Sequence, residues 1–136
     1  MATFNKFNSF VEALAEKTHN LGSDQLVVAL TNTAPNATDT QLSAITQVSY
    51  TNLSSRNITT STSSQTSGTY KLVLTDLVLT SSGGSTGPFR YVVIYNDTAT
   101  NDELIGYYDY GSSITLADGE TLTIDFDASN GVLTIA

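Results

Sequence analysis

The sequence predicts a mainly β domain, an antiparallel β-sandwich or barrel with one N-terminal α-helix. Short apolar runs rich in β-branched residues alternate with clusters of turn formers along most of the chain. Only the first segment spaces its apolar residues by three or four positions, as an amphipathic helix does. Because no helical segment separates the later strands, we expect neighbouring strands to pair antiparallel.

Length and charge limit the classes of protein and partner. We expect one domain over residues 1–136, because single cores commonly form at about 100 to 150 residues. Thirteen acidic and five basic residues give a net charge of −8. This sign is wrong for neutralising nucleic-acid phosphates or anionic lipids, so we expect neither nucleic acid nor membrane as a partner. The absence of cysteine excludes disulfides and cysteine-based metal sites.

The N-terminal helix is expected over about residues 3–20. Its apolar face consists of Phe4, Phe7, Val11 and Leu14. Gly22 follows the periodic residues, and a glycine in that position commonly ends a helix. In the simpler interpretation this face packs on the domain's own sheet. In the alternative, with Phe10 added, the helix contacts a neighbouring subunit, and the candidate interface is formed by Phe4, Phe7, Phe10, Val11 and Leu14.

The first strands follow the helix. Residues 25–31 form a β-branched apolar run that ends in a Pro-containing loop, which predicts a buried strand. Residues 39–49 are compatible with a short helical turn. The Ser/Thr-rich stretch 51–69 cannot build a core, so we expect an exposed hairpin or edge strand there, with an extended docking arm as the alternative.

The second half of the chain carries the strongest strand pattern. Strands are predicted over 70–79, with a β-bulge near Thr75 and Asp76, and then over 89–95, 103–110, 121–126 and 132–135. A Gly-rich loop at 81–87 separates the first two of these. Asn130-Gly131 indicates a tight turn before the last strand.

No catalytic constellation is visible, so we expect neither enzyme activity nor a cofactor or metal site. His19 is the single histidine, and a polar residue near a helix C-terminus, where positive charge is favoured, explains it better than a catalytic triad does. The Gly-rich loop joins two strands and has no following Lys or helix, which does not fit a phosphate-binding loop.

Two patterns suggest ligands, and each has a simpler explanation. Asp125 and Asp127, followed by Ser129 and Gly131, resemble a calcium loop, but strand alternation around Phe126 also places both carboxylates outward. Acidic residues near four tyrosines suggest a carbohydrate platform, yet tyrosine is also ordinary strand filling. These tyrosines are Tyr95, Tyr107, Tyr108 and Tyr110.

Several short blocks resemble small structural proteins of tailed bacteriophages, and together they span the chain outside about residues 51–67. They are Phe4-Asn5-Lys6-Phe7, His19-Asn20-Leu21-Gly22, Ala29 to Pro35, Ser67-Gly68-Thr69-Tyr70, Gly87-Pro88-Phe89-Arg90, Tyr95-Asn96-Asp97-Thr98 and Gly111-Ser112-Ser113-Ile114. The resemblance implies a capsid decoration or cement protein, made in the host cytoplasm and carried on the outer surface of the virion capsid. Its implied partners are the major capsid protein and copies of itself, in trimers. A tail-tube, tail-terminator or baseplate component is the first alternative, and a carbohydrate-binding module is the second.

Overall fold

The computed structural model describes residues 2–136. These residues form ten β-strands, one α-helix and one 3-10 turn. In chain order they are β1 (Phe4–Lys6), α1 (Ser9–Ala15), β2 (Leu26–Thr31), η1 (Leu42–Ala44), β3 (Asn57–Ile58), β4 (Thr60–Thr66), β5 (Thr69–Leu74), β6 (Leu77–Thr80), β7 (Thr86–Asn96), β8 (Leu104–Leu116), β9 (Thr121–Ile124) and β10 (Leu133–Ile135). The predicted mainly β class with an N-terminal helix is confirmed, and no closed barrel is found among these residues.

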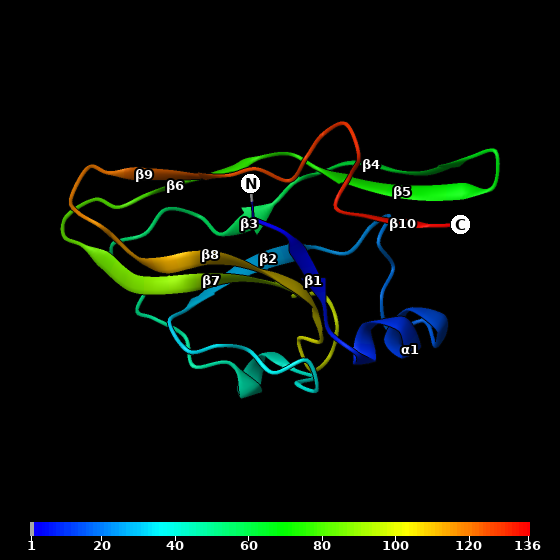
Figure 1. The fold of residues 1–136 in the computed structure, drawn as a ribbon, viewed down its shortest axis with the longest axis horizontal. Coiled ribbons are helices and arrows are strands. Elements are labelled where there is room, and N and C mark those ends of the chain that lie inside the picture. Colours follow the sequence, from blue (N-terminus) through cyan, green and yellow to red (C-terminus); the bar gives the residue numbers. More distant parts are fainter. Residues whose placement is uncertain (1) are drawn as a thin grey trace.

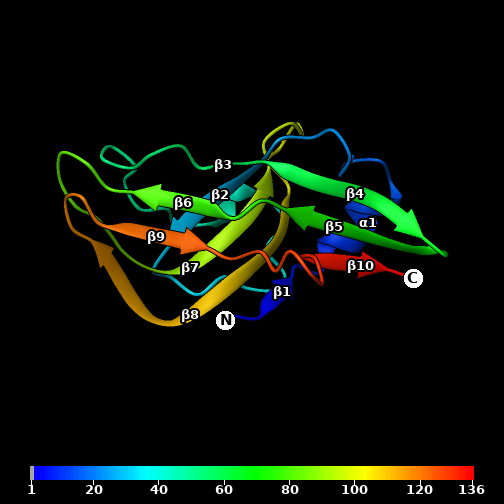
Figure 2. The same cartoon turned by 90° about the horizontal axis from the view of Figure 1, so that it is seen from above.

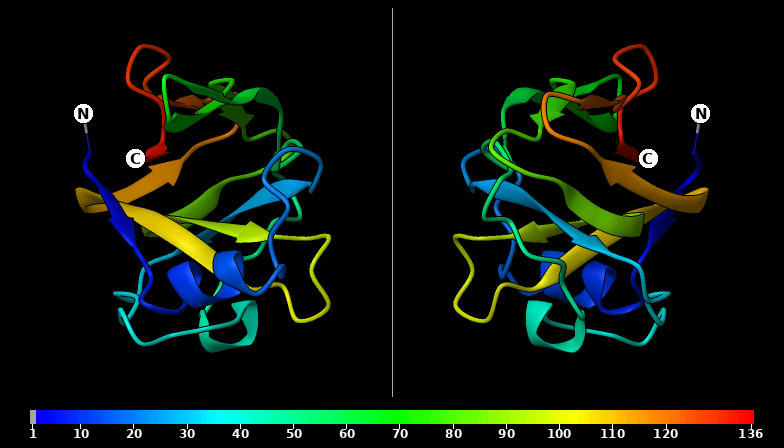
Figure 3. Two further views of the ribbon diagram at one scale, coloured as in Figure 1. Left: turned by 90° about the vertical axis from the view of Figure 1, so that its right-hand side faces the viewer. Right: turned by 90° about the vertical axis from the view of Figure 1, so that its left-hand side faces the viewer.

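The strands form two layers. The larger sheet has the order β1-β8-β7-β2-β3, and every pair in it is antiparallel. Two smaller sheets, β10-β5-β4 and β6-β9, lie end to end above it (Figures 1 and 2). Seen end on, α1 and η1 lie below the larger sheet, on the side away from the smaller ones (Figure 3).

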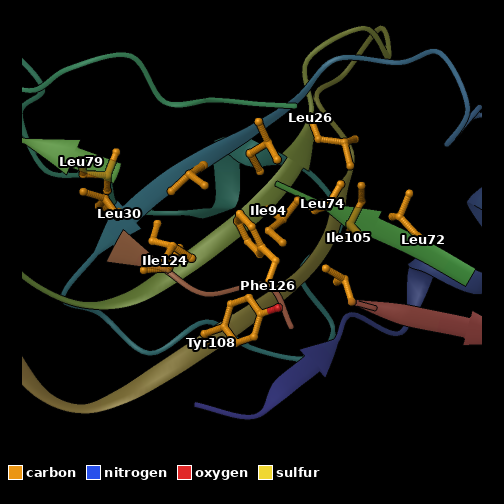
Figure 4. Close-up of a cluster of buried hydrophobic side chains, with 14 of the residues drawn as sticks. Leu26, Leu30, Leu72, Leu74, Leu79, Ile94, Ile105, Tyr108, Ile124 and Phe126 are labelled. Atoms are coloured by element: carbon orange, nitrogen blue, oxygen red, sulfur yellow. The ribbon is translucent and has the colours of Figure 1, made fainter. Parts of the chain in front are cut away.

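The main hydrophobic core fills the space between the two layers (Figure 4). Leu26, Val28 and Leu30 alternate along β2 and face this core, as period-two side chains do. The upper layer contributes Leu72, Leu74, Leu79, Ile124 and Phe126. A continuous buried surface therefore joins both small sheets to the larger one.

A second core covers the opposite face of the larger sheet. Val27 and Ala29, the alternate residues of β2, pack there with Phe7, Val93 and Leu104. Ile45, just after η1, and the half-buried Leu42 close this cluster from below. Because both faces of β2 are covered, all six of its residues are buried.

The predicted helix over residues 3–20 is wrong in its extent. Phe4–Lys6 form β1, where Phe4 pairs with Tyr108 of β8 and their ring centroids lie 5.7 Å apart. The spacing of Phe4 and Phe7 fits a helix, but the backbone groups of Phe4–Lys6 pair with β8 and form a strand. The helix covers only Ser9–Ala15, and Lys17, at φ 72°, takes the left-handed position that was expected of Gly22.

Within the polar stretch 51–69, Thr60–Thr66 form an edge strand, as expected, and this strand makes a hairpin with β5, most of which lies beyond the stretch. Strand β4 pairs only with β5 and lies at the edge of its sheet. The two strands are joined by Ser67 and Gly68, whose φ angles of 51° and 85° suit a type I′ turn. We call this hairpin, β4 and β5 together, the arm, and it reaches one extreme end of the molecule (Figure 1).

The predicted bulge and the predicted last turn have different roles in the structure. The irregularity at Thr75 and Asp76 is a change of sheet and not a bulge, because β5 pairs with β4 and β10 whereas β6 pairs with β9. Asn130-Gly131 does not close a hairpin, since β9 and β10 belong to different sheets. The local sequence marks both positions as interruptions of a strand, but it does not show with which strands the flanking segments pair.

Candidate interaction surface

A groove of about 540 Å³ opens between α1 and the underside of the arm. In the β10-β5-β4 sheet, Tyr70 of β5 pairs with Ile135 of β10 on one side and with Gln65 of β4 on the other. Tyr70 lies two residues before the buried Leu72 and therefore on the same face of the sheet. This underside therefore continues the core face of the upper layer past the larger sheet. The lining is mainly apolar and includes Leu14, Ala15, Leu21, Tyr70 and Ile135.

Exposed apolar side chains lie at the same end of the molecule. Val11 on α1 is 54% exposed and Ile135 on β10 is 44% exposed. Val78, at 51%, belongs to β6 in the opposite half of the upper layer (Figure 1). Ile135 lines the groove. Val11 lies one helical turn before the lining residues Leu14 and Ala15. Val78 has no such relation to the groove.

The structure divides the five residues predicted as an interface. Phe7 and Phe10 are buried in the chain's own cores, so the expectation that they contact a neighbour is wrong. Phe4 is half-buried against Tyr108. Val11 and Leu14 remain accessible, one exposed and one lining the groove. The aromatic side chains of this set therefore pack within the domain, and its aliphatic side chains are accessible.

The arm lies in a stretch without acidic residues. All thirteen acidic side chains fall outside residues 40–75, which contain only two basic residues, Arg56 and Lys71. Arg56 donates to the Val28 carbonyl at 2.7 Å, and Lys71 donates to the Ser129 carbonyl at 3.0 Å. The remainder of the chain, with thirteen acidic and three basic residues, carries −10. The arm, whose single charge is that of Lys71, therefore projects from a strongly acidic body, the chain outside residues 40–75. This charge pattern is present in the sequence but is not part of its strand pattern.

His19 lies in a buried hydrogen-bond network beside the groove. The side-chain amide of Asn96 donates to His19 Nδ1 at 2.9 Å and to Asp24 Oδ2 at 2.7 Å. Burial lowers the pKa of His19, against the opposing effect of Glu103 and Asp24. Because Nδ1 accepts the Asn96 hydrogen bond, it carries no proton and the ring is neutral in this arrangement, which does not fit the expected positive charge at the helix end. Its accepting Nδ1 leaves the proton on Nε2, which has no partner.

The suspected calcium carboxylates hold turns. Asp127 accepts from the backbone N–H groups of Ser129 and Asn130, and the Asn130 side-chain amide lowers the pKa of this carboxyl. Asp125 accepts from the backbone N–H of Asp127. Within residues 2–136, no three His, Cys, Asp or Glu side chains form a group suited to a metal ion. The expected turn is present, but β9 ends at Ile124, so Asp125 and Asp127 follow the strand and do not lie within it.

The four tyrosines do not share a surface. Tyr107 and Tyr108 are neighbours on β8 and pack on opposite faces, against the second and main cores respectively. Tyr95 and Tyr108 are buried, at 4% and 5% exposure. Tyr108 and Tyr110 both line a small hollow of about 270 Å³ that Asp125 also lines, whereas Tyr95 and Tyr107 pack in the second core. Sheet alternation thus separates rings that look adjacent in the sequence.

Comparisons with known proteins do not assign the chain to a family. No family model, curated protein or solved structure matches it. Among residues 2–136, no helix is long and apolar enough to cross a membrane. What the groove and the arm can bind therefore has to follow from their own apolar and uncharged residues.

Proposed function

We propose that this chain is a structural protein of a phage virion, a decoration protein that binds the major capsid protein at the groove end of the molecule. The observation that carries the proposal is the apolar groove between α1 and the arm, with Val11 and Ile135 exposed beside it. The nature of the partner comes from the resemblance to small phage structural proteins.

The surroundings of the groove suit a protein interface. Stable interfaces combine an apolar centre with a polar rim, and here the apolar lining is bordered by Ser63, Lys17 and Asn20. The one histidine is buried and its accepting Nδ1 is already bonded to Asn96, so no unprotonated ring nitrogen is free to act as a general base. Clamping a shell requires complementary surfaces and no chemistry. The acidic body also keeps a densely decorated coat soluble, because like charges repel.

A binding assay with charged variants tests this function. We expect the double variant Val11→Asp/Ile135→Asp to lose at least about tenfold in affinity for shells stripped of the protein, because it places charge in the interface centre. Val78→Asp is the matched control, since Val78 is equally exposed but lies on β6. Co-sedimentation of labelled protein with the shells of the phage that encodes it gives the affinity. Equal binding by wild type and the double variant, or loss with Val78→Asp alone, contradicts the proposal.

The alternative of a tail-tube, tail-terminator or baseplate component uses the same kind of surface in a different place. It predicts rings or stacks confined to the tail, whereas decoration predicts many copies over the shell. A carbohydrate-binding role gains no support, because Tyr107 and Tyr108 face opposite sides of the sheet.

A further inference from the structure

Among residues 2–136, β4 is the longest strand that pairs with only one other strand. Six strands have a single partner, and β4 has seven residues whereas the others have two to four. Proteins usually protect such edges with charges, proline or a bulge. Thr60–Thr66 contain no charge and no proline, and the register is irregular only between Thr60 and Thr62. An open edge of this kind can accept another strand.

The register shows which groups are free to pair. A two-residue turn closes the arm, so Thr66 and Thr69 form a hydrogen-bonded pair and the alternate pairs do the same. The backbone groups of Ser63 and Gln65 therefore point to the open edge. The side chains of Thr62, Ser64 and Thr66 are exposed on one face of the sheet.

We propose that two copies of this chain pair antiparallel through β4, about a two-fold axis near Ser64. The two β10-β5-β4 sheets then become one continuous six-stranded sheet. Ser63 of each copy lies opposite Gln65 of the other, and Ser64 lies opposite its own copy, close enough for a hydroxyl contact. The edge is thus complementary to itself.

Charge makes the arm the least repulsive place for two copies to meet. Each body carries −10, and most body-to-body contacts would bring these charges together. The arm carries one charge, that of Lys71, which is bonded to the Ser129 carbonyl. Because the arm projects from one end of the molecule, antiparallel pairing of two arms places the acidic bodies at opposite ends (Figure 2).

The two-fold pairing has a geometric consequence. An axis perpendicular to the joined sheet keeps both undersides, and therefore both grooves, on the same side. Two grooves that face one shell would bind with avidity. The pairing itself does not depend on the proposed function, and it differs from the trimers that the resemblance implies.

Sedimentation velocity of the purified full chain, over a range of concentrations without capsids, tests the pairing. We expect a reversible dimer that both Ser64→Glu and Ser64→Lys weaken by about fivefold, because each places like charges directly opposite. An equal mixture of these two variants should recover the dimer, since Glu then faces Lys. Thr134→Glu is the matched control, because Thr134 and Ser64 flank Lys71 in the same row on opposite edges of the sheet.

A chain that stays monomeric, or an assembly of another order, overturns the proposal. Equal weakening by Ser64→Glu and Thr134→Glu also overturns it, as does a mixture that fails to recover. Recovery by the mixture shows that the single variants are folded. Dimers in solution with no binding to shells would refute the proposed function and leave the pairing intact.

Discussion

Asn96 should be the most important polar side chain for stability, and Asn96→Ala tests this. Asn96 is completely buried at the end of β7. Its amide donates to His19 and Asp24, and its carbonyl accepts from the backbone N–H groups of Thr98 and Ala99 at 3.0 and 3.2 Å. One side chain thus ties the segment after α1 to the loop between β7 and β8.

The expected loss follows from these four hydrogen bonds. The bond to the Asp24 carboxylate is charge-assisted and contributes about 2 kcal/mol, and each neutral bond contributes about 0.5 to 1 kcal/mol. These contributions sum to about 3.5 to 5 kcal/mol, but Asp24, Thr98 and Ala99 are half-buried or exposed and recover part of their loss from water. We therefore expect Asn96→Ala to lower the free energy of unfolding by about 3 to 4 kcal/mol.

Urea unfolding followed by far-UV circular dichroism measures this loss. Asn36→Ala is the control, because the Asn36 side chain also accepts from a backbone N–H two residues ahead but is exposed. We expect the control to cost less than about 1 kcal/mol. A loss below about 1 kcal/mol for Asn96→Ala would refute the account of this network.

Three further predictions concern other sites. Since burial lowers the pKa of His19 from its usual 6.5, the unfolded chain binds more protons below pH 6.5, and stability should fall as the pH drops from there towards the folded-state pKa. A thermal unfolding series should show this slope in the wild type and a flatter one in His19→Gln. Gly106→Ala should cost about 1 to 3 kcal/mol in urea unfolding, because the added methyl group meets the Phe4 ring and displaces β1. Excess calcium should leave the melting temperature unchanged, because Asp125 and Asp127 already hold a turn, and a clear rise would contradict that assignment.

The sequence predicts the strands well where one or both faces are buried. Leu26 to Leu30 and Phe89 to Tyr95 are dense in β-branched and aromatic residues, and both segments lie in the larger sheet. The N-terminal segment misleads because a spacing of three, from Phe4 to Phe7, fits a helix as well as a strand that leads into one. Pairing with β8 makes Phe4–Lys6 a strand, and this contact joins two segments that lie far apart in the sequence.

The candidate site is harder to predict because its residues come from distant segments. Leu14, Tyr70 and Ile135 meet only after β10 pairs with β5. No local pattern marks them as neighbours. The unpaired state of β4 is likewise a property of the whole sheet, although its polar composition already indicates an exposed edge.

If the proposed function is right, cryo-microscopy of purified virions should locate this chain, and no other measurement tests the proposal as directly. We expect density for the chain at many symmetry-related positions on the outer shell, with the groove between α1 and the arm turned towards the major capsid protein. Density confined to the tail, or absence of the chain from the particle, would contradict it.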